Sequence, residues 1–330
     1  MERIGIVGAG AWGTALATVT ARAGRAAVLW AHEPEVARGI AEAGENRVYL
    51  PGIRLSELIA PTADLARIAA CDVILWVTPA QFVRPVLRQF APHYRPGTPL
   101  VMCAKGIEEG TLALMSDVLA EELPQAPWGV LSGPTFAAEV AKGQPTAITL
   151  ACADEALAAR IADALAAPGF RPYWSKDVIA AEVGGAVKDV LAIAGGIVSG
   201  RNLGHNAQSA LITRGIAEIT RLAVAKGADE VSLMGLAGLG DLILTATSMM
   251  SRNFSLGAAL GEGQSLDGIL GARRAVTEGV FTARPVRALA ARDGVDMPIA
   301  SAVAAILFDG AGIDETITDL LGRPLRAERD

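Results

Sequence analysis

Thiol and imidazole side chains are scarce in this chain. Its 330 residues include three cysteines and three histidines, which are Cys71, Cys103, Cys152, His32, His93 and His205. The cysteines lie far apart and match no metal-ligand spacing, and an odd, sparse count argues against a disulfide framework. Three histidines are too few for a histidine-rich metal site. We therefore expect no metal, no disulfide and a reducing, cytoplasmic environment.

Charged residues are also few. Asp, Glu, Lys and Arg make up 19% of the chain, against about 25% in an average globular protein. The formal net charge is −6 and nothing in the sequence forms a basic face, so nucleic acid is a poor candidate partner. Either the surface carries little charge or a partner covers part of it, and the many uncharged helical stretches are compatible with an oligomer. Any site for an anion must be local and built from a few lysines or arginines.

Long apolar runs are missing as well. No uninterrupted run reaches the roughly 18 residues that a membrane helix needs, so we expect no membrane span. The N-terminus has some features of a secretion signal, with Arg3 before an apolar run and "ALA" at 15–17 resembling a cleavage site. Glycines at positions 5, 8, 10 and 13 interrupt that run, which favours a folded turn over a signal peptide.

Two patterns of hydrophobic residues follow one another along the chain. In the first half, short apolar segments alternate with helical stretches, which predicts a doubly wound α/β domain with a parallel sheet. The expected strands are RIGIVGAG, AAVLWAH, CDVILWVTP, PLVMCAKG, WGVLSGP, TAITLAC and FRPYWS. From residue 178 to 321 no strand is expected, and helices are predicted over 178–199, 207–226, 229–235, 252–262, 280–292 and 298–309. We therefore predict a dinucleotide-binding domain over 1–178 and an all-helical substrate and catalytic domain over 179–330.

The turn after the first strand carries the first chemical signal. Gly8, Gly10 and Gly13 form G-x-G-x-x-G between a strand and a helix, where the glycines allow a tight turn, close approach of a pyrophosphate and close helix–strand packing. The N–H groups at the helix start would receive the phosphates. A purely structural turn and an S-adenosylmethionine site remain alternatives at this point.

The second strand ends in "VLWAHEP", without an acid at its tip to bind a ribose hydroxyl. Glu33 lies two residues beyond Ala31, and His32 could face a 2′-phosphate or the adenine. This pattern gives a slight preference for NADPH and leaves NADH possible. His32 as a simple exposed loop residue is the alternative.

Ligands of open α/β sheets bind at the carboxyl ends of the strands. Lys105 lies at one such end, in "CAKGIE", and Ser132, Gly133 and Thr135 lie at another, in "LSGPTFA". Thr78 follows a third strand beside the expected cofactor crevice. Beside a bound anion Lys105 would be a ligand, whereas elsewhere it would be a surface residue.

A lysine lies within the apolar helix "AEVGGAVKDVLAIAGGIVSG". The helix is apolar nearly all round and should be buried, and Lys188 leans over Gly184 and Gly185, which would leave room for a small ligand. We expect burial and nearby cations to lower the pKa of Lys188, which suits an acid/base role. The alternative is a lysine that reaches solvent over a helix-packing notch.

Three further motifs lie downstream. Asp241 falls in the glycine-rich turn "GLAGLGDL", and Arg252 and Asn253 in "SRN" fall at the start of a helix, where phosphate binding is favoured. The third motif is "VTEG" at 276–279. Taken singly, such residues are more often helix caps or surface residues than ligands.

Together these motifs resemble the bacterial NAD(P)-dependent glycerol-3-phosphate dehydrogenases, from about residue 4 to about residue 323. The segments that carry the resemblance are GAGAWGTALA, LWAHEPE, CAKGIE, SGPTFAAEVAKGQPTA, VGGAVKDV, ALITRGIAEITRLA, GLAGLGDL and SRN. The resemblance implies a Rossmann domain joined to a helical domain like that of 6-phosphogluconate dehydrogenase, in a cytoplasmic homodimer. It also implies reduction of dihydroxyacetone phosphate to sn-glycerol 3-phosphate for phospholipid synthesis.

The resemblance also implies roles for individual residues. Lys188 would be the general base, or the acid in the reverse direction. The substrate would be held by Lys105, Gly133, Thr135, Lys188, Asp241, Ser251, Arg252 and Asn253. The cofactor would lie along Gly8, Gly10, Ala11, Trp12, Gly13, His32, Lys105, Ala137, Arg252, Val276 and Glu278.

The sequence departs from the family at two places. Asp189 stands where the family usually has Asn after the catalytic lysine, and Ala11 offers no hydroxyl to a phosphate. Because adjacent helix positions do not face each other, we expect little effect of Asp189 on Lys188. Two other functions compete: a ketopantoate reductase or β-hydroxyacid dehydrogenase would not need "SRN", and a non-enzymatic NAD(P) sensor would not need Lys105, Lys188 and Asp241 together.

Overall fold

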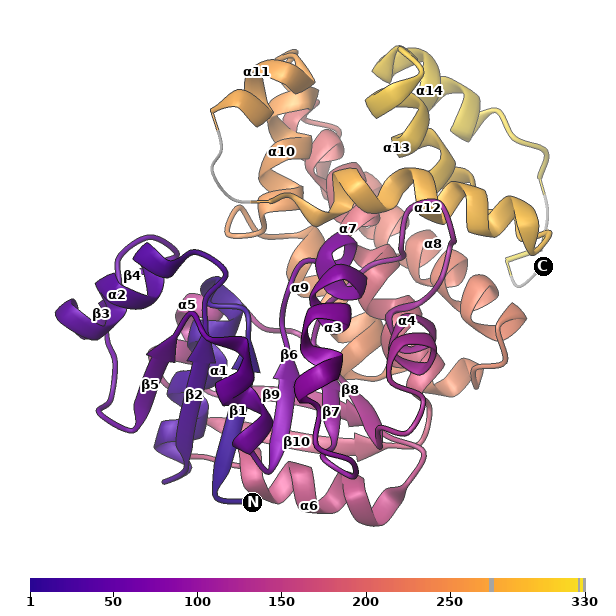
Figure 1. The fold of residues 1–330 in the computed structure, drawn as a ribbon. Helices are drawn as coiled ribbons and strands as arrows, with labels where there is room; N and C mark the ends of the chain where they lie inside the picture. The colour runs from indigo at the N-terminus through magenta and orange to yellow at the C-terminus, as the bar shows by residue number, and fades with distance from the viewer. Residues whose placement is uncertain (273–275, 326, 329–330) are drawn as a thin grey trace.

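The computed structural model describes residues 1–272, 276–325, 327 and 328. A sheet domain in the first half carries a helical domain above it (Figure 1), as the two hydrophobic patterns predict. The N-terminal apolar run forms β1 (Arg3–Val7), the glycine turn and α1 (Ala11–Arg22), all packed into the sheet domain. Nowhere in the described residues is there a helix long and apolar enough to cross a membrane.

The main sheet of the described chain has eight strands in the order β5-β2-β1-β6-β7-β8-β9-β10. After β1 these are β2 (Ala26–Trp30), β5 (Ile59–Thr62), β6 (Val73–Trp76), β7 (Leu100–Met102), β8 (Trp128–Ser132), β9 (Thr146–Ala151) and β10 (Phe170–Ser175). Helices α1, α5 (Ala137–Ala141) and α6 (Glu155–Leu165) pack on one face, and α3 (Val83–Phe90) and α4 (Met115–Glu122) on the other. The predicted doubly wound α/β domain is therefore confirmed.

One part of the predicted parallel sheet is wrong, because β8 pairs antiparallel with β9. The connection contains only α5, a five-residue helix. Such a helix rises about 7 Å, which is too short to return the chain along the roughly 16 Å of a five-residue strand. The longer α6 then allows β10 to pair parallel with β9.

The sequence analysis also missed β5, the edge strand next to β2. Its four residues include Pro61, and prolines within a strand weaken the pattern although edge strands tolerate them. A second missed segment lies between α2 (Pro34–Ala43) and β5, where β3 (Glu45–Asn46) and β4 (Leu50–Arg54) form a small hairpin.

The helical domain is built around α7 (Val178–Gly200), which is buried along most of its length. The helices in contact with α7 are α8 (Gly204–Ala225), α9 (Asp241–Ala246), α10 (Arg252–Gly261), α12 (Glu278–Arg292) and α13 (Pro298–Phe308). Two outer helices are α11 (Leu266–Gly271) and α14 (Ile313–Leu321). The sequence predicts the longer helices within a few residues, and misses the shorter α9, α11 and α14.

Glycines let α7 and α10 approach at backbone distance. A Cβ on Gly196 would lie 2.0 Å from the Phe254 carbonyl oxygen, and one on Gly257 would lie 2.0 Å from the Ile193 carbonyl oxygen. Neither helix could keep this separation with any larger residue at these positions. The start of α10 is thereby held close to the middle of α7.

A buried carboxyl group caps α13. Glu218 of α8 accepts hydrogen bonds from the backbone N–H groups of Ile299 at 2.7 Å and Ala300 at 3.1 Å. Burial raises the pKa of Glu218 to about 7, and the two backbone hydrogen bonds oppose this shift only in part.

We predict a pH-dependent stability from this carboxyl group. Because its pKa is higher in the folded protein than in the unfolded chain, stability should fall as pH rises from about 4.5 to about 7. The free energy of unfolding of the wild type should therefore fall by about 3 kcal/mol relative to that of Glu218→Gln between these two pH values. Urea unfolding at pH 5 and pH 8 measures it, with Glu315→Gln on exposed α14 as control. A difference that is constant with pH would contradict the prediction.

Candidate active site

The glycine turn after β1 has the geometry of a phosphate cradle. Gly8 has φ +119°, and a Cβ on Gly13 would lie 1.8 Å from the Gly8 carbonyl oxygen, so both positions require glycine. A Cβ on Gly10 would meet no described atom within 4 Å, which leaves open space at this position. Helix α1 begins at Ala11, and no side chain among the described residues caps its first turn. Its first N–H groups are therefore available to an anion.

Asn46 supports this turn, and the sequence analysis missed it. Its side chain is buried and its Nδ2 donates to the Ala9 carbonyl oxygen at 2.8 Å and to Thr14 Oγ1 at 2.8 Å. Asn46 lies in the small hairpin, more than thirty residues along the chain from the turn. No local pattern could have identified it, because the hairpin is brought to the turn only by the fold.

At the end of β2, His32 is exposed and its ring lies 5.9 Å from the Trp30 ring. Glu33, the acid nearest to the strand tip, accepts a hydrogen bond from the Tyr49 hydroxyl at 3.0 Å. Its carboxylate is therefore already engaged with the hairpin region. This arrangement agrees with the absence of an acid at the strand tip itself.

The central feature of the site is a carboxylate between two lysines. Asp241 Oδ2 lies 2.6 Å from Lys105 Nζ and its Oδ1 lies 2.7 Å from Lys188 Nζ. Lys105 comes from the end of β7, Lys188 from the middle of α7, and Asp241 from the first turn of α9. Asp241 is 1% exposed and Lys188 6%. The structure thus brings together three of the predicted residues from both domains.

The two lysines differ in their electrostatic environment. Burial lowers the pKa of Lys105, and the attraction of Asp241 compensates only in part. Burial acts the same way on Lys188, but Asp189 and Asp241 outweigh it, so the pKa of Lys188 is raised. The predicted lowering for Lys188 is therefore wrong, because the sequence did not reveal that two carboxylates would face this ammonium. Burial would raise the pKa of Asp241, yet the two lysines hold it below its usual value.

Asp189 contacts the lysine that precedes it. Its Oδ1 lies 3.4 Å from Lys188 Nζ, which contradicts the expected small effect. The expectation assumed that neighbouring helix positions point apart, but the long lysine side chain can bend back to its neighbour's carboxylate. Lys188 is consequently held by Asp189, Asp241 and the Thr245 hydroxyl, to which it donates at 2.8 Å.

Thr245 is a second residue that the sequence analysis missed. It lies one turn after Asp241 on α9, and its hydroxyl donates to Asp241 Oδ1 at 3.2 Å. The spacing of four residues between Asp241 and Thr245 could have indicated this contact, because residues four apart on a helix lie on the same face. Asp241 itself is the first residue of α9 and not part of the glycine-rich turn, which ends at Gly240.

Gly184 and Gly185 serve packing and not the space for a ligand that the sequence suggested. A Cβ on Gly184 would lie 2.6 Å from the Ala237 carbonyl oxygen, and one on Gly185 would lie 2.7 Å from Ser132 Oγ. The space beside Lys188 at these positions is filled by protein atoms. The two glycines let α7 approach both the turn before α9 and the end of β8.

The end of β8 supplies a backbone oxygen to the site. Gly133 has φ +155°, and its carbonyl oxygen accepts hydrogen bonds from Lys105 Nζ at 3.3 Å and from the Thr135 hydroxyl at 3.2 Å. Ala137 begins α5 just beyond. Gly133 and Thr135 therefore lie beside Lys105, as predicted from their place at a strand end.

One side-chain hydrogen bond caps the start of α10, and a second joins it to the start of α12. Ser251 Oγ accepts from the Phe254 N–H at 3.2 Å, and Asn253 Oδ1 accepts from the Gly279 N–H at 2.9 Å. Both capping residues are buried, while Arg252 between them is exposed. The "SRN" motif thus lies at a helix start, as predicted, and next to the segment that contains Val276.

Glu278 lies at the start of α12 and is electrostatically coupled to the site. Burial raises its pKa to about 7, with a further contribution from the Asp189 carboxylate, and Arg252 opposes the shift. A Cβ on Gly279 would lie 2.5 Å from the Asp189 carbonyl oxygen, so α12 starts directly against α7. No cluster of three metal-ligating side chains occurs anywhere in the part of the chain that the structure describes.

Known proteins match this chain over its whole length. Family models described as NAD-dependent glycerol-3-phosphate dehydrogenase N-terminus and C-terminus match residues 3–158 and 177–318. Proteins named glycerol-3-phosphate dehydrogenase [NAD(P)+] from Caulobacter vibrioides and Parvibaculum lavamentivorans are 57% and 56% identical over 327 residues, covering 99% of this chain and 99% and 98% of theirs. The crystal structure of glycerol-3-phosphate dehydrogenase from Coxiella burnetii is 38% identical, with a TM-score of 0.94 over 98% of this chain and 99% of that one.

A more distant comparison bears on the competing functions. A ketopantoate reductase structure from Ralstonia eutropha is 18% identical with a TM-score of 0.63 over 92% of this chain and 97% of that one. At this identity the likeness shows a shared fold and nothing about the reaction.

We predict that Asp189→Asn lowers the pKa of Lys188, because one of the two carboxylates that stabilise its ammonium is removed while burial remains. A titration of the lysine side-chain carbons by NMR, with Lys188 assigned by mutation, measures the shift. Asp319→Asn on the remote α14 removes the same charge and should leave Lys188 unchanged. An unaltered or higher pKa in Asp189→Asn would contradict the assigned contact.

Proposed function

The chain belongs to the NAD-dependent glycerol-3-phosphate dehydrogenase family, and within that activity we propose that Lys188 is the general acid and base. The protein is an oxidoreductase that interconverts dihydroxyacetone phosphate and sn-glycerol 3-phosphate with NADH or NADPH. The observation that carries the proposal is the buried ammonium of Lys188, held by Asp189, Asp241 and Thr245. Neither a different dehydrogenase nor a non-enzymatic sensor accounts for the family match.

The residues present fit a dinucleotide cofactor. The open position at Gly10 and the uncapped first turn of α1 form a cradle for a pyrophosphate. When bound, the reduced nicotinamide supplies the hydride that reduces the C2 carbonyl of the substrate. We assign the cofactor surface to the glycine turn with Ala11 and Trp12, to His32 and Ala137, and to Arg252, Val276 and Glu278.

In the direction of reduction, Lys188 gives a proton to the C2 oxygen as that oxygen gains negative charge. Its raised pKa keeps the ammonium protonated near neutral pH, so the proton is present, but it also makes Lys188 a weaker acid than a lysine whose pKa lies near the working pH. In the direction of oxidation, Lys188 must first lose its proton, so alkaline pH favours that reaction. Asp241 keeps the ammonium in place in both directions.

Lys105 is proposed to stabilise the developing negative charge on the same oxygen. It is held between Asp241 and the Gly133 carbonyl oxygen, so its ammonium is oriented before the substrate binds. Its lowered pKa marks a desolvated charge, and a desolvated charge interacts more strongly with an oxyanion than a hydrated one. Gly133 and Thr135 would hold the substrate beside it.

The phosphate of the substrate is assigned to the start of α10. This ten-residue helix presents its N-terminal dipole and N–H groups there, together with Ser251, Arg252 and Asn253. Arg252 is the cation of this group, and guanidinium groups bind phosphate through paired hydrogen bonds. The other two fix the helix start and the adjoining start of α12.

We propose NADPH as the slightly preferred cofactor. The tip of β2 has no acid at the place where a ribose hydroxyl is usually bound, which leaves that place to a 2′-phosphate, and the carboxylate of the nearby Glu33 accepts a hydrogen bond from Tyr49. His32 is exposed at the same place and could donate to the 2′-phosphate.

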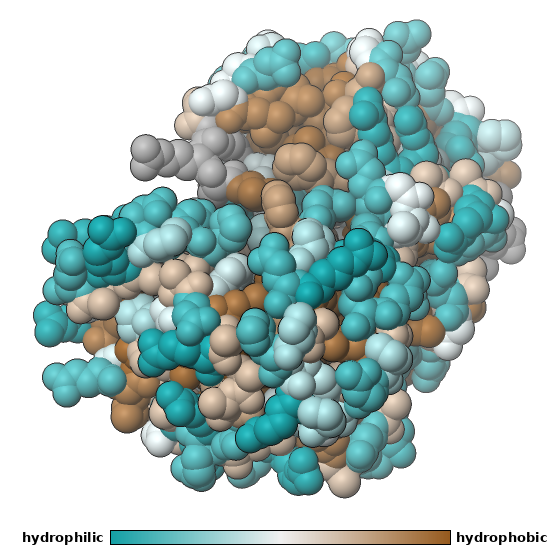
Figure 2. Space-filling model, in the orientation of Figure 1, coloured by the Kyte–Doolittle hydropathy of each residue, from teal (hydrophilic) through white to brown (hydrophobic). Residues whose placement is uncertain are grey.

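A homodimer is proposed from the surface of the helical domain. Figure 2 shows a hydrophobic area in the region where Figure 1 has α10, α11, α13 and α14. Partly exposed apolar residues on these helices include Leu266, Leu270, Ile306 and Ile313. Apolar patches of this kind commonly mark interfaces between proteins.

Three further assignments are proposed with it. The two domains would divide at residues 178 and 179, close to the start of α7 at Val178. The three cysteines are free, which suits a reducing cytoplasm. The product would serve phospholipid synthesis.

We predict that Lys188→Ala lowers kcat for dihydroxyacetone phosphate reduction by about 10²- to 10⁴-fold, the usual contribution of a positioned acid. The assay follows NAD(P)H absorbance at 340 nm, and circular dichroism with a thermal melt verifies the fold. Lys176→Ala is the matched control, because Lys176 is exposed and pairs only with Glu155 among the described salt bridges. Near-wild-type turnover of folded Lys188→Ala would overturn the assignment.

The same assay tests the cofactor proposal. We expect kcat/KM to be higher with NADPH than with NADH, and His32→Ala to reduce the value for NADPH more than that for NADH. Equal losses with both cofactors, or a preference for NADH, would contradict the assignment of His32 to the 2′-phosphate.

A further inference from the structure

We propose that Gln81 and Arg84 are positioning residues that hold Lys105 in place through the loop that follows it. The inference rests on the proposed role of Lys105. Neither residue touches Lys105 in the described contacts, and both bind the segment from Ile107 to Glu109, two to four residues further along.

The backbone around Lys105 needs such support. Gly106, the next residue, has φ +153°, and a Cβ there would lie 2.6 Å from the Ala80 Cβ, so the loop passes closely over residues 80–82. The loop closes on itself only further along, where the Glu108 N–H donates to Ala113 and the Leu112 N–H donates to Glu108. The direction of the chain at Lys105 is therefore set by the contacts of residues 106–109.

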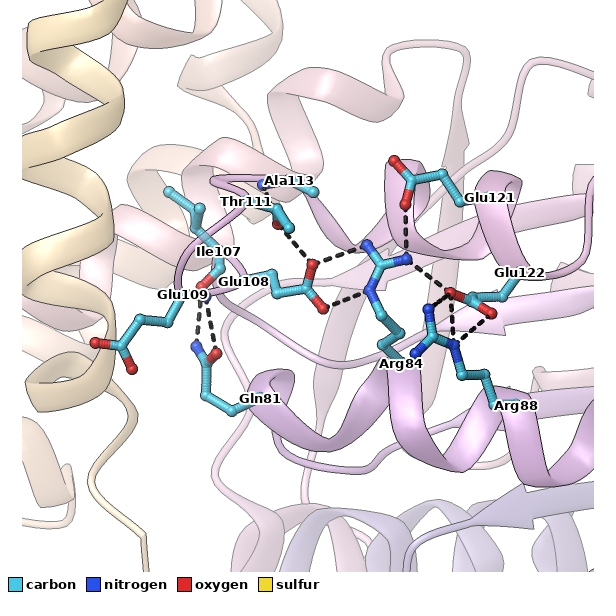
Figure 3. Close-up of polar contacts among 10 residues, drawn as sticks. All are labelled: Gln81, Arg84, Arg88, Ile107, Glu108, Glu109, Thr111, Ala113, Glu121 and Glu122. Carbon is cyan, nitrogen blue, oxygen red and sulfur yellow. Dashed lines mark hydrogen bonds and ion pairs between the residues drawn. The ribbon is translucent and has the colours of Figure 1, made fainter.

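Gln81 binds the backbone of the loop at two points. Its Nε2 donates to the Ile107 carbonyl oxygen at 2.9 Å, and its Oε1 accepts from the Glu109 N–H at 2.9 Å. Figure 3 shows the amide of Gln81 facing this short stretch of chain. The Gln81 side chain thus bonds the carbonyl oxygen before Glu108 and the N–H group after it. These two bonds fix both the position and the rotation of the backbone at Glu108.

Arg84 binds the same segment through Glu108. Arg84 Nε lies 2.8 Å from Glu108 Oε1 and its Nη2 lies 2.8 Å from Glu108 Oε2, a two-point pairing visible in Figure 3. The other side of the guanidinium reaches Glu122 at 2.7 Å and Glu121 at 2.6 Å, both at the end of α4. The hydrogen bond from Arg84, more than any other cause, holds the pKa of Glu108 below its usual value.

Burial distinguishes this pairing from an ordinary surface ion pair. The side chains of Arg84, Glu108 and Glu122 are 15%, 13% and 13% exposed. Exposed ion pairs contribute little, whereas a two-point pairing of arginine with a carboxylate at a partly buried site also fixes geometry. Arg84 therefore ties α3, α4 and the loop into one unit.

The opposite side of the loop is anchored in the helical domain. Ile107 and Leu114 are buried in the core of that domain. Just beyond, the N–H and hydroxyl of Ser116 both donate to the buried Glu182 of α7. The loop is held from both domains, and Lys105 lies at its start, where its ammonium meets Asp241 of the helical domain. A shift of the loop would move that ammonium relative to the substrate.

The test is a double-mutant cycle with Lys105. Arg84→Gln should lower kcat/KM for dihydroxyacetone phosphate by about ten- to a hundredfold, because a displacement of about 1 Å at a reacting group can cost that much. In the Lys105→Met background the same change should cost less than about twofold, since a residue that acts through Lys105 has nothing left to position. A purely structural role would lower activity equally in both backgrounds.

Arg88 provides the matched control. It lies one turn further along α3, its side chain is 65% exposed, and it pairs with Glu122 but not with the loop. Arg88→Gln removes the same charge from the same cluster and should keep kcat/KM within about twofold of the wild type. A loss in Arg88→Gln as large as that in Arg84→Gln would overturn the proposal.

A second variant covers the possibility that Arg84→Gln does not fold, because it leaves three carboxylates close together. Gln81→Leu removes both backbone hydrogen bonds without changing any charge, and the same cycle with Lys105→Met then decides. Equal losses in both Lys105 backgrounds overturn the positioning role alone. If Lys105→Met itself leaves kcat/KM unchanged, the proposed role of Lys105 fails, and this inference fails with it.

Discussion

The site depends on one buried carboxylate that lies between two ammonium groups. Asp241 bonds to Lys105 from the sheet domain and to Lys188 from the helical domain, at 2.6 and 2.7 Å. Buried charges are tolerated only when each has a close partner of opposite sign. With Asp189 as the fourth member, the cluster carries two positive and two negative charges. The opposite charges balance, which allows the buried Lys188 and the partly buried Lys105 to lie close together.

Close backbone packing makes this arrangement possible. Gly184 and Gly185 allow α7 to approach the turn before α9 and the end of β8, and Gly196 allows it to approach α10. The backbones that carry Lys105, Lys188 and Asp241 are therefore held close together, which lets the three side chains meet. The same packing brings the start of α10, assigned to the phosphate, against the helix that carries Lys188. Helix α7 thus places Lys188, the proposed acid, next to the start of α10, where the substrate phosphate is assigned.

Local pattern was sufficient for features that depend on a few neighbouring residues. The alternation of the main strands with helices, the tight turn at Gly8 and Gly13, and the helix start at Arg252 could be predicted, because each follows from spacing along the chain. The antiparallel β9 could not, because it depends on the length of a connection. Asn46 could not, because its contact with the glycine turn joins segments far apart in sequence.

The sequence by itself determined a dinucleotide-binding turn, a two-domain α/β and helical chain, and the family whose motifs it carries. Only the tertiary structure decided in which direction the pKa values of the two central lysines are shifted. The pKa of Lys188 was expected to be lowered, yet Asp189 and Asp241 raise it, while at Lys105 burial outweighs Asp241 and lowers the pKa. The physical reason is that a pKa depends on distances to all surrounding charges. Those distances arise from packing between both domains, which no local stretch of sequence contains.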